Sequence, residues 1–318
     1  MKPFAFVFPG QGSQSVSMLD GWGDHVQVRD ALAEASDALG EDIGRLIKDG
    51  PKEALALTTN TQPVMLVAGV AAYRVWMAEV GVAPQAVAGH SLGEYSALVA
   101  AGVLTLAQAA PLVRFRAQAM QEAVPVGQGA MAAILGLDAA KVIAGCAEVT
   151  ASYGPGSAEI VEAVNFNDPG QTVIAGSKAA VEQASVALKA MGAKRALSLP
   201  VSAPFHSSLM KPAALKLKEK LETTAFAAPH MPVINNIDVA VATDANGIRD
   251  ALYRQAFGPV RWVECVQALG ARGVTTLVEC GPGKVLAGMT KRINPDMQGL
   301  ALFDPASLAE VKTVVLEA

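Results

Sequence analysis

Apolar residues along the 318-residue chain form two kinds of run, some only four or five residues long and others spanning several helical turns. The short runs at 4–8 and 85–88 are typical of strands buried in a parallel sheet, and 275–278 is the last strand that the pattern predicts. Residues 61–79 and 105–123 are long enough for helices, and in the second of them apolar side chains recur every three or four positions. Buried strands combined with such helices predict an α/β fold.

The stretch from residue 127 to residue 198 has a different texture. Its pattern predicts, in order, strand, helix, two strands, helix and strand, at residues 130–135, 138–150, 160–165, 172–175, 177–191 and 194–199. This βαββαβ order is that of the ferredoxin-like fold. Because Gly127–Gly129 and Pro200 mark hinges at its ends, we expect 127–198 to be a small subdomain inserted between 1–126 and 199–318. A crevice between the two units is the natural ligand site.

Composition and charge limit the functions open to the chain. Apolar residues make up 52% and the formal net charge is −4, so a large core is expected and the basic surplus of a nucleic-acid-binding protein is missing. The three cysteines lack metal-ligand spacing and are expected to be free thiols. The apolar run at 4–8 is too short for a signal peptide, and the run at 64–77 is broken by Arg74. We expect a cytoplasmic monomer that binds neither nucleic acid nor membranes.

The segment Gly89-His90-Ser91-Leu92-Gly93 lies where a short strand gives way to a helix-prone run. A G-x-S-x-G sequence in this context predicts a sharp turn that holds its serine in a strained backbone conformation and presents the hydroxyl to solvent. The glycines are needed because a Cβ at either position would clash where strand and helix approach. The start of the helix directs unpaired N–H groups toward the same point. Ser91 is therefore a candidate nucleophile with an oxyanion site beside it.

The first predicted strand runs into a glycine-containing loop, Pro9-Gly10-Gln11-Gly12-Ser13-Gln14. The loop fails the dinucleotide-binding pattern because Ser15 stands in the place of the third glycine, and it lacks the lysine of a phosphate-binding loop. We interpret it as a strand-end loop that brings Gln11 to a site at the carboxyl edge of the sheet. An ordinary turn between strand and helix explains this stretch equally well.

The predicted helix at 105–123 carries a charge on its apolar face. Arg116 falls within the apolar stripe, whereas Arg114 lies on the polar face and is expected to be solvated. A buried guanidinium needs an anion, since an isolated buried charge costs several kcal/mol. An internal Asp or Glu is the commoner partner, and a carboxylate that arrives with a substrate is the alternative. Pro111 is expected to kink or shorten this helix.

Four histidines are candidates for the base that a serine nucleophile needs. His25 lies among polar residues and His90 is adjacent to Ser91, so we expect neither to be the base. His206 lies in a loop stiffened by two prolines, which positions a side chain well, and we predict it as the general base, with His230 the weaker candidate. No Asp or Glu stands out as a third triad member. Because His206 lies far from the C-terminus, the residue order disfavours an ordinary lipase or esterase.

Five segments, taken in order, carry a further signal. They are the loop at 8–14, the turn at 89–95, Arg116 with Met120-Gln121, Asn165 through 170–176, and the turn at 279–284. Together they closely resemble the malonyl-CoA:acyl-carrier-protein transacylase family of fatty-acid synthesis, and the likeness extends over essentially the whole chain. The resemblance implies an α/β-hydrolase-like large subdomain with a ferredoxin-like insertion, in agreement with the pattern described above.

The resemblance also implies roles for individual residues. It makes Ser91 the acylated nucleophile and His206 its partner. The backbone amides of Gln11 and Leu92 would form the oxyanion hole. In this family a backbone carbonyl, in place of an acid, orients the histidine, and the matching residue here is Gln255. That correspondence accounts for the missing triad carboxylate.

The same resemblance concerns the substrate pocket. Arg116 would hold the malonyl carboxylate in a bidentate pair, and Asn165 matches a position that lines the thioester cleft. Many bacterial stand-alone members have serine before the histidine, whereas Phe205 stands here, as in malonyl-selective acyltransferase domains of polyketide synthases. A phenyl ring leaves little room for an α-methyl branch, so we expect malonyl to be preferred over methylmalonyl by about 1–3 kcal/mol.

The implied reaction is a ping-pong transfer from malonyl-CoA to the phosphopantetheine thiol of acyl carrier protein, through a malonyl-serine and without a cofactor or a metal. The alternatives are a discrete acyltransferase of polyketide synthesis, a serine thioesterase or hydrolase, and a catalytically idle subunit that docks the carrier. Carrier proteins are acidic, which makes cations near the cleft candidates for docking. These candidates are Lys194, Arg195, Lys284 and Arg292.

Overall fold

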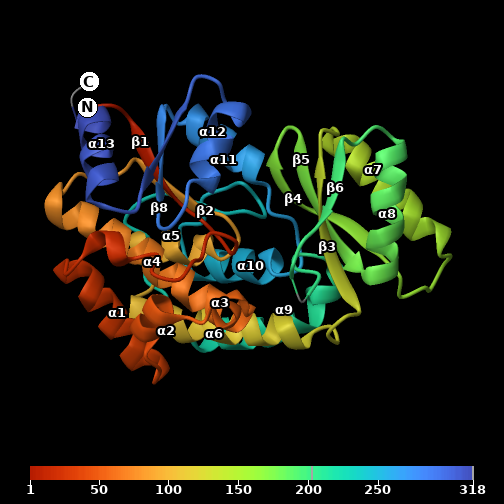
Figure 1. Cartoon of the computed structure of the whole chain (residues 1–318), viewed down its shortest axis with the longest axis horizontal. Coiled ribbons are helices and arrows are strands. Elements are labelled where there is room, and N and C mark those ends of the chain that lie inside the picture. Colours follow the sequence, from red (N-terminus) through yellow and green to blue (C-terminus); the bar gives the residue numbers. More distant parts are fainter. Residues whose placement is uncertain (202, 317–318) are drawn as a thin grey trace.

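The larger of two sheets is parallel throughout and has the strand order β7-β2-β1-β8-β9 (Figure 1). The computed structural model describes residues 1–201 and 203–316. The strands are β1 (Phe4–Phe8), β2 (Ala86–Gly89), β7 (Val233–Ile234), β8 (Thr276–Cys280) and β9 (Gln298–Leu302). The prediction that the strand at 275–278 is the last one is wrong, because β9 follows it. Gln298 and Gly299 open β9 without apolar bulk, so its apolar run is too short to stand out.

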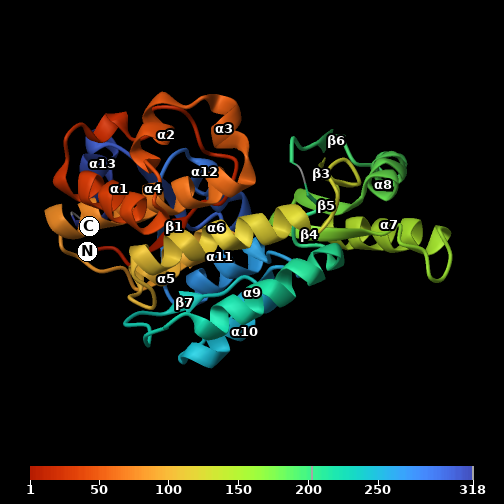
Figure 2. The ribbon, with the colours of Figure 1, turned by 90° about the horizontal axis from the view of Figure 1, so that it is seen from below.

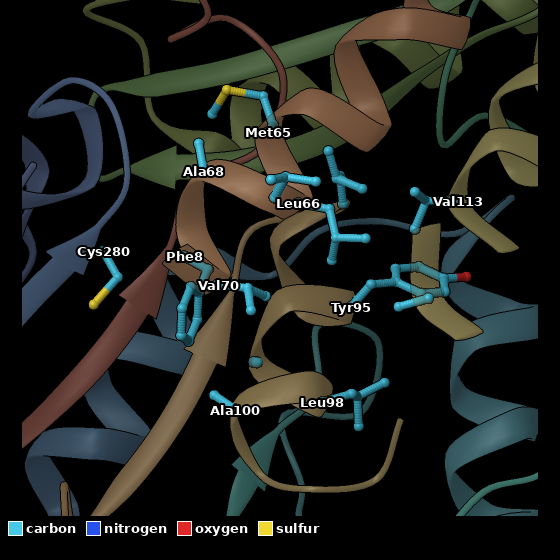
Figure 3. Close-up of a cluster of buried hydrophobic side chains, with 14 of the residues drawn as sticks. Phe8, Met65, Leu66, Ala68, Val70, Tyr95, Leu98, Ala100, Val113 and Cys280 are labelled. Carbon is cyan, nitrogen blue, oxygen red and sulfur yellow. The ribbon is translucent and has the colours of Figure 1, made fainter. Parts of the chain in front are cut away.

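Strand β1 separates the core of this sheet into two layers. Its phenylalanines pack on one face against α4 (Thr58–Glu79) and α5 (Gly93–Ala100). Figure 3 draws part of that layer, with Phe8 among side chains of α4 and α5. On the other face Ala5 and Val7 pack against α11 (Trp262–Ala271) and α12 (Val285–Ile293). A strand buried on both faces is what its continuous apolar run predicts.

The other helices outside the smaller sheet's unit lie around the larger sheet or extend from it. They are α1 (Val26–Leu39), α2 (Ile43–Asp49), α3 (Lys52–Ala56), α6 (Leu106–Glu122), α9 (Lys211–Thr223), α10 (Ala245–Gln255) and α13 (Pro305–Leu316), with short 3-10 turns at Asp20–Trp22 and Ser208–Met210. Figure 2 shows α6 and α9 running together toward the smaller sheet. Of the two expectations for Pro111, a kinked or a shortened helix, the shortening is wrong, since α6 continues past it. The apolar face of α6 is buried on both sides of Pro111, and that packing outweighs the lost hydrogen bond.

The smaller sheet is antiparallel, with the strand order β4-β5-β3-β6. Its elements are β3 (Gly129–Leu135), α7 (Ala139–Ser152), β4 (Val161–Asp168), β5 (Gln171–Ser177), α8 (Lys178–Ala190) and β6 (Arg195–Ser198). Both helices cover one face, which confirms the predicted α/β class with a ferredoxin-like unit in an α/β-hydrolase-like one. We propose that 127–198 is the inserted subdomain and that 1–126 with 199–318 forms the larger one, because every strand of the small sheet lies within those limits.

Strand β4 fastens the small sheet to the rest of the molecule. Val260 joins its backbone, accepting from Phe166 N at 3.0 Å and donating to Val164 O at 2.8 Å. At the end of β4 the ring of His90 lies 2.8 Å from Asn167 Oδ1. Asp168 there also pairs with Arg292 of α12 at 2.8 Å. In the described ranges no helix has both the length and the apolar character needed to cross a bilayer.

Candidate active site

Ser91 sits in the turn between β2 and α5 with its backbone in the left-handed region, at a φ of 53°. The flanking glycines are needed there. A Cβ on Gly89 would lie 1.9 Å from the backbone of Gly93, and one on Gly93 would lie 2.0 Å from Phe8 O. The Ser91 N–H donates to Asn236 Oδ1 at 2.8 Å, which holds the turn from a distant segment. The turn predicted from the glycine spacing is therefore formed, and it presents the hydroxyl to a cavity.

His206 approaches this hydroxyl from the loop that follows the small sheet. Its Nε2 lies 2.7 Å from Ser91 Oγ, and its Nδ1 lies 2.9 Å from the backbone oxygen of Gln255. Because a carbonyl only accepts, Nδ1 carries the proton and Nε2 is free to accept from the serine. His206 also adopts a left-handed backbone, with φ at 66°, so both members of the pair are held by strained positions.

Burial of His206, together with the nearby charge of Arg116, lowers the pKa of the imidazole to about 3. The ring is 4% exposed, and desolvation disfavours its charged form. At neutral pH it is therefore an unprotonated acceptor aimed at Ser91 Oγ. A base in this state can take the serine proton without first losing one of its own.

Arg116 reaches the same hydroxyl from α6 although its side chain is almost fully buried. Its terminal nitrogens donate to Gln62 Oε1 at 2.7 Å, to Gln255 Oε1 at 3.1 Å and to Ser91 Oγ at 3.1 Å. The guanidinium also stacks 5.5 Å from the ring centre of Tyr95. Among the described residues no carboxylate lies within 4.0 Å of it. The commoner expectation, an internal acid as partner, is therefore wrong, and neutral amides hold the charge instead.

Arg114, two positions earlier, behaves in the opposite way. Its side chain is 15% exposed and pairs with Glu41 at 2.7 Å, so the expectation of a solvated charge is wrong. Residue Glu41 follows α1, and the packing of α1 against α6 brings it over this face. Helical periodicity correctly places the two arginines on different faces of α6. It does not indicate which distant element covers the face that carries Arg114.

A chain of side-chain amides and a hydroxyl links Arg116 to the Pro9–Gln14 loop. Gln62 Nε2 donates to Thr58 Oγ1 at 3.2 Å, and Thr58 Oγ1 donates to Gln11 Oε1 at 2.9 Å. Sequence reasoning missed Gln62 and Thr58. The sequence offers little signal, because the two residues belong to a run of five polar residues that opens α4 and only the structure shows that both are buried. Buried polar side chains in such a run need partners, and here the partners are site residues.

The predicted oxyanion residues lie on the wall of the same cavity. Gln11 and Leu92 both line it, on either side of Ser91. Within residues 1–201 and 203–316 the backbone N–H of neither residue is hydrogen-bonded to another protein group. Both N–H groups therefore remain available to an acceptor. Leu92 precedes the first residue of α5, where the helix dipole favours negative charge.

The cavity above Ser91 has a volume of about 120 Å³. Its polar end is formed by Ser91, His206 and Arg116, and apolar side chains complete its wall. These are Met120, Met131, Leu199, Val201 and Phe205. A second cavity of about 260 Å³ shares Gln11 and Asn165 with the first and extends toward α12. Both lie between the two sheets, where the crevice is predicted.

Asn165 lies on β4 and lines both cavities. Its Oδ1 is buried and has no hydrogen-bond partner within the described chain. A buried acceptor without a partner is costly, and a donor group on a bound molecule could satisfy it. The structure thus brings together Ser91, His206, Gln11, Leu92, Arg116, Asn165 and Phe205 around one cavity, with Gln255 directly behind it.

The other candidates lie elsewhere or have other partners. His25 caps α1, and His230 packs against Gly102 and does not line the cavity. His90 lines it but is held by Asn167, and burial lowers the pKa of its ring.

The three cysteines are buried and free. No group of three or more His, Cys, Asp or Glu in the described residues could hold a metal.

The four cations predicted to dock a carrier differ in their contacts within the protein. Arg292 is paired with Asp168, and Lys284 lies over the ring of Phe303 at 5.2 Å. Lys194 and Arg195 are exposed at the start of β6. Their role in docking a carrier stays a prediction.

Comparison with known proteins agrees with this geometry. Residues 5–299 match the acyl transferase domain family. The chain is 54% identical over 310 residues to the malonyl CoA-acyl carrier protein transacylase of Escherichia coli K12, covering 97% of this chain and 98% of that protein. The chain belongs to this transacylase family. Its resemblance to the family, stated from five sequence segments, is therefore confirmed.

Solved structures of relatives have the same architecture. An acyl-carrier-protein S-malonyltransferase from Burkholderia pseudomallei 1710b matches with a TM-score of 0.94 at 63% identity, over 98% of this chain and 99% of that one. A malonyl-transacylase in complex with a type II polyketide synthase acyl carrier protein matches with a TM-score of 0.94 at 50% identity, over the whole of both chains. The fold class predicted from the hydrophobic pattern is confirmed by these structures.

Proposed function

We propose that the protein transfers the malonyl group from malonyl-CoA to the phosphopantetheine thiol of acyl carrier protein, in fatty-acid synthesis, through a malonyl ester on Ser91. One observation carries the proposal. A serine hydroxyl, an unprotonated imidazole and a guanidinium that has no carboxylate partner among the described residues converge within 3.1 Å in one cavity. Relatives of this chain are named for the same transfer.

Acylation begins with proton transfer. Ser91 Oγ loses its proton to His206 Nε2 as it attacks the thioester carbon, and the Gln255 carbonyl stabilises the imidazolium through Nδ1–H. The negative charge that develops on the thioester oxygen is directed to the N–H groups of Gln11 and Leu92. Collapse of the tetrahedral intermediate breaks the C–S bond. The imidazolium returns its proton to the departing sulfur, and coenzyme A leaves.

Arg116 selects acyl groups that end in a carboxylate. Its NH1 and NH2 atoms have three amide or hydroxyl acceptors among the described residues, and its Nε has none, so donor capacity remains for an anion. A malonyl carboxylate supplies the charge that the pocket lacks. Its hydrogen bonds to a guanidinium are stronger than those to neutral groups, which gives malonyl an advantage over acetyl.

Transfer completes the cycle when the carrier thiol replaces coenzyme A in the cavity. His206 takes the thiol proton, the sulfur attacks the malonyl carbonyl carbon, the ester C–O bond breaks, and the imidazolium returns the proton to Ser91 Oγ. Water is the competing nucleophile, and the apolar wall formed by Met120, Met131 and Phe205 limits its access. All these groups belong to one chain, which supports action as a monomer; we propose the cytoplasm as its location.

The proposal is tested by following the acyl group. Incubation with malonyl-CoA and intact-mass measurement should show one malonyl adduct, and peptide mapping should locate it on Ser91. Addition of holo acyl carrier protein should move the group to the carrier. Release of free malonate at the same rate with and without carrier would instead identify a hydrolase. The absence of any adduct, with carrier binding intact, would identify a docking subunit.

The same transfer could serve fatty-acid or polyketide synthesis, and comparing carrier proteins from the two pathways as acceptors distinguishes these alternatives. We expect a fatty-acid carrier to be malonylated with the higher kcat/KM. Higher kcat/KM with a polyketide carrier would support the alternative of a discrete polyketide acyltransferase. The malonyl-transacylase solved with a polyketide carrier makes this a necessary comparison.

A further inference from the structure

A second polar cluster lies behind the Ser91 turn, on the side away from the cavity. Its centre is Glu94, which is in the first turn of α5 and only 2% exposed. Glu94 Oε2 accepts from Gln255 Nε2 at 2.9 Å and from the backbone N–H of Asn236 at 2.9 Å. The proposed mechanism does not use this carboxyl, and a buried carboxyl without a basic partner is costly to retain.

The contacts of Gln255 show what Glu94 controls. The amide Nε2 donates to Glu94 and to Ser91 O, at 2.9 Å and 3.0 Å, and this orientation leaves Oε1 to accept from Arg116. A rotated amide would place its oxygen against two acceptors and its NH2 group against the guanidinium. Neither contact is a hydrogen bond, because acceptors would face acceptors and donors would face donors.

We propose that Glu94 is a positioning residue for acyl selectivity: it fixes the Gln255 amide with Oε1 toward Arg116, so that the guanidinium stays beside Ser91 Oγ, where a malonyl carboxylate is to be bound. This inference rests on the proposed function. Glu94 touches neither substrate nor Arg116 directly and acts through Gln255.

The Ser91 turn has supports that do not pass through Glu94, although Asn236 N also donates to Glu94. Asn236 keeps its bonds to Ser91 N and to Gly89 O, and its own carbonyl accepts from Arg261 N. The His206 contact uses the main chain of Gln255, which its side chain does not alter. A change at Glu94 should therefore disturb the Arg116 side of the site and spare the serine–histidine pair.

Position of the acceptor, and not its charge, is the property that matters. Burial raises the pKa of Glu94 to about 7, countered by the hydrogen bonds from Gln255 and Asn236. With a proton on Oε1, Oε2 can still accept both bonds. Glu94→Gln keeps an oxygen at the same reach, whereas Glu94→Asp keeps the carboxylate but shortens the side chain by one bond, about 1.5 Å.

The test measures Ser91 acylation by malonyl-CoA and by acetyl-CoA, as the second-order rate of coenzyme A release in the burst. We expect Glu94→Asp to lower the malonyl-over-acetyl preference about tenfold through the malonyl rate, while the acetyl rate stays within about threefold. Glu94→Gln should keep the preference within about threefold. Glu279→Asp, which shortens another buried carboxyl, at the end of β8, is the matched control and should leave the preference unchanged.

Coupling to Arg116 decides the assignment. In an Arg116→Ala background, Glu94→Asp should cause no further loss of preference, because the group through which it acts is gone. Equal falls with both thioesters would show a merely structural role and overturn the inference. So would a loss with Glu94→Gln alone, which would indicate charge, or an additive loss in the Arg116→Ala background.

Two further results keep the outcomes separate. If Glu94→Asp does not fold, Gln255→Met tests the link from its other end. It keeps the main-chain oxygen for His206 and should lower the malonyl rate more than the acetyl rate, and an unchanged preference would overturn the inference. If the unmodified protein shows no Ser91 adduct or no malonyl preference, the proposed function fails instead.

Discussion

Two side chains approach the Ser91 hydroxyl, and the regions that hold them are built differently. His206, at 2.7 Å, stands on a short loop with a left-handed backbone and is oriented by a main-chain carbonyl. Arg116, at 3.1 Å, projects from a long helix and is oriented by the side-chain amides of Gln62 and Gln255. One support is made of backbone and the other of exchangeable side chains.

This difference separates two properties of the site. Exchange of a neighbouring side chain leaves a main-chain acceptor in place, so the proton-transfer geometry is protected against most substitutions. The guanidinium position depends on amides that single substitutions remove. Acyl selectivity should therefore change more readily than the chemistry itself, and four predictions test that contrast.

The largest effect is expected at His206. His206→Ala removes the base for every acyl group, so acylation by malonyl-CoA and acetyl-CoA should both fall about 10²–10⁴-fold. Quenched-flow measurement of coenzyme A release gives both rates. A loss confined to malonyl-CoA would contradict the division of roles.

Arg116→Ala should lower malonyl acylation about 100-fold, because charge-assisted hydrogen bonds to the carboxylate are lost. Acetyl acylation should fall much less, since acetyl offers no carboxylate. The two kcat/KM values, with thermal unfolding as a folding control, measure the ratio. If both thioesters lose the same factor, Arg116 has no part in carboxylate recognition.

Phe205→Ala should open space beside Ser91 without touching the amides. We expect methylmalonyl to gain on malonyl by about tenfold, as removal of a steric exclusion of one methyl group allows. Competition between the two thioesters, read by mass spectrometry of the Ser91 adduct, gives the ratio directly. An unchanged ratio would show that the ring does not limit the α-carbon.

The smallest effect is expected from pH. Because the pKa of His206 is lowered to about 3, its imidazole stays neutral until the pH falls toward that value. Malonyl acylation should vary less than about threefold between about pH 5.5 and 8, where a histidine of pKa about 6.5 would lose most of its activity. Burst rates across this range test it, and an acid limb near pH 6.5 would refute it.

Local sequence patterns predicted much of the fold and the site. The turn at Ser91 follows from glycines whose added Cβ atoms would overlap backbone, a constraint that lies within a few residues. Helical periodicity placed Arg116 inward, and βαββαβ order predicted the small sheet. Each of these predictions depends on the spacing of residues that are close together in the sequence. The roles of Gln11, Leu92 and Gln255 came from family resemblance instead.

What could not be predicted depends on contacts between distant segments. Glu94 meets Asn236 across 142 residues and Gln255 across 161 residues, and no local pattern specifies either contact. The partner of Arg116 was open for the same reason, since pattern shows that a charge is buried and not what surrounds it. Strand β9 was missed because it is short and opens with Gln298-Gly299.

The fastening of β4 to the large sheet has a consequence for how substrates come and go. Backbone bonds at Val260, the His90–Asn167 contact and the Arg292–Asp168 pair fix the spacing of the two walls. Because that spacing is fixed, the phosphopantetheine arm of a carrier can enter a preformed channel. No domain closure around the arm is then required. Successive carriers then meet an identical entrance, and the length of the arm determines whether its thiol reaches Ser91.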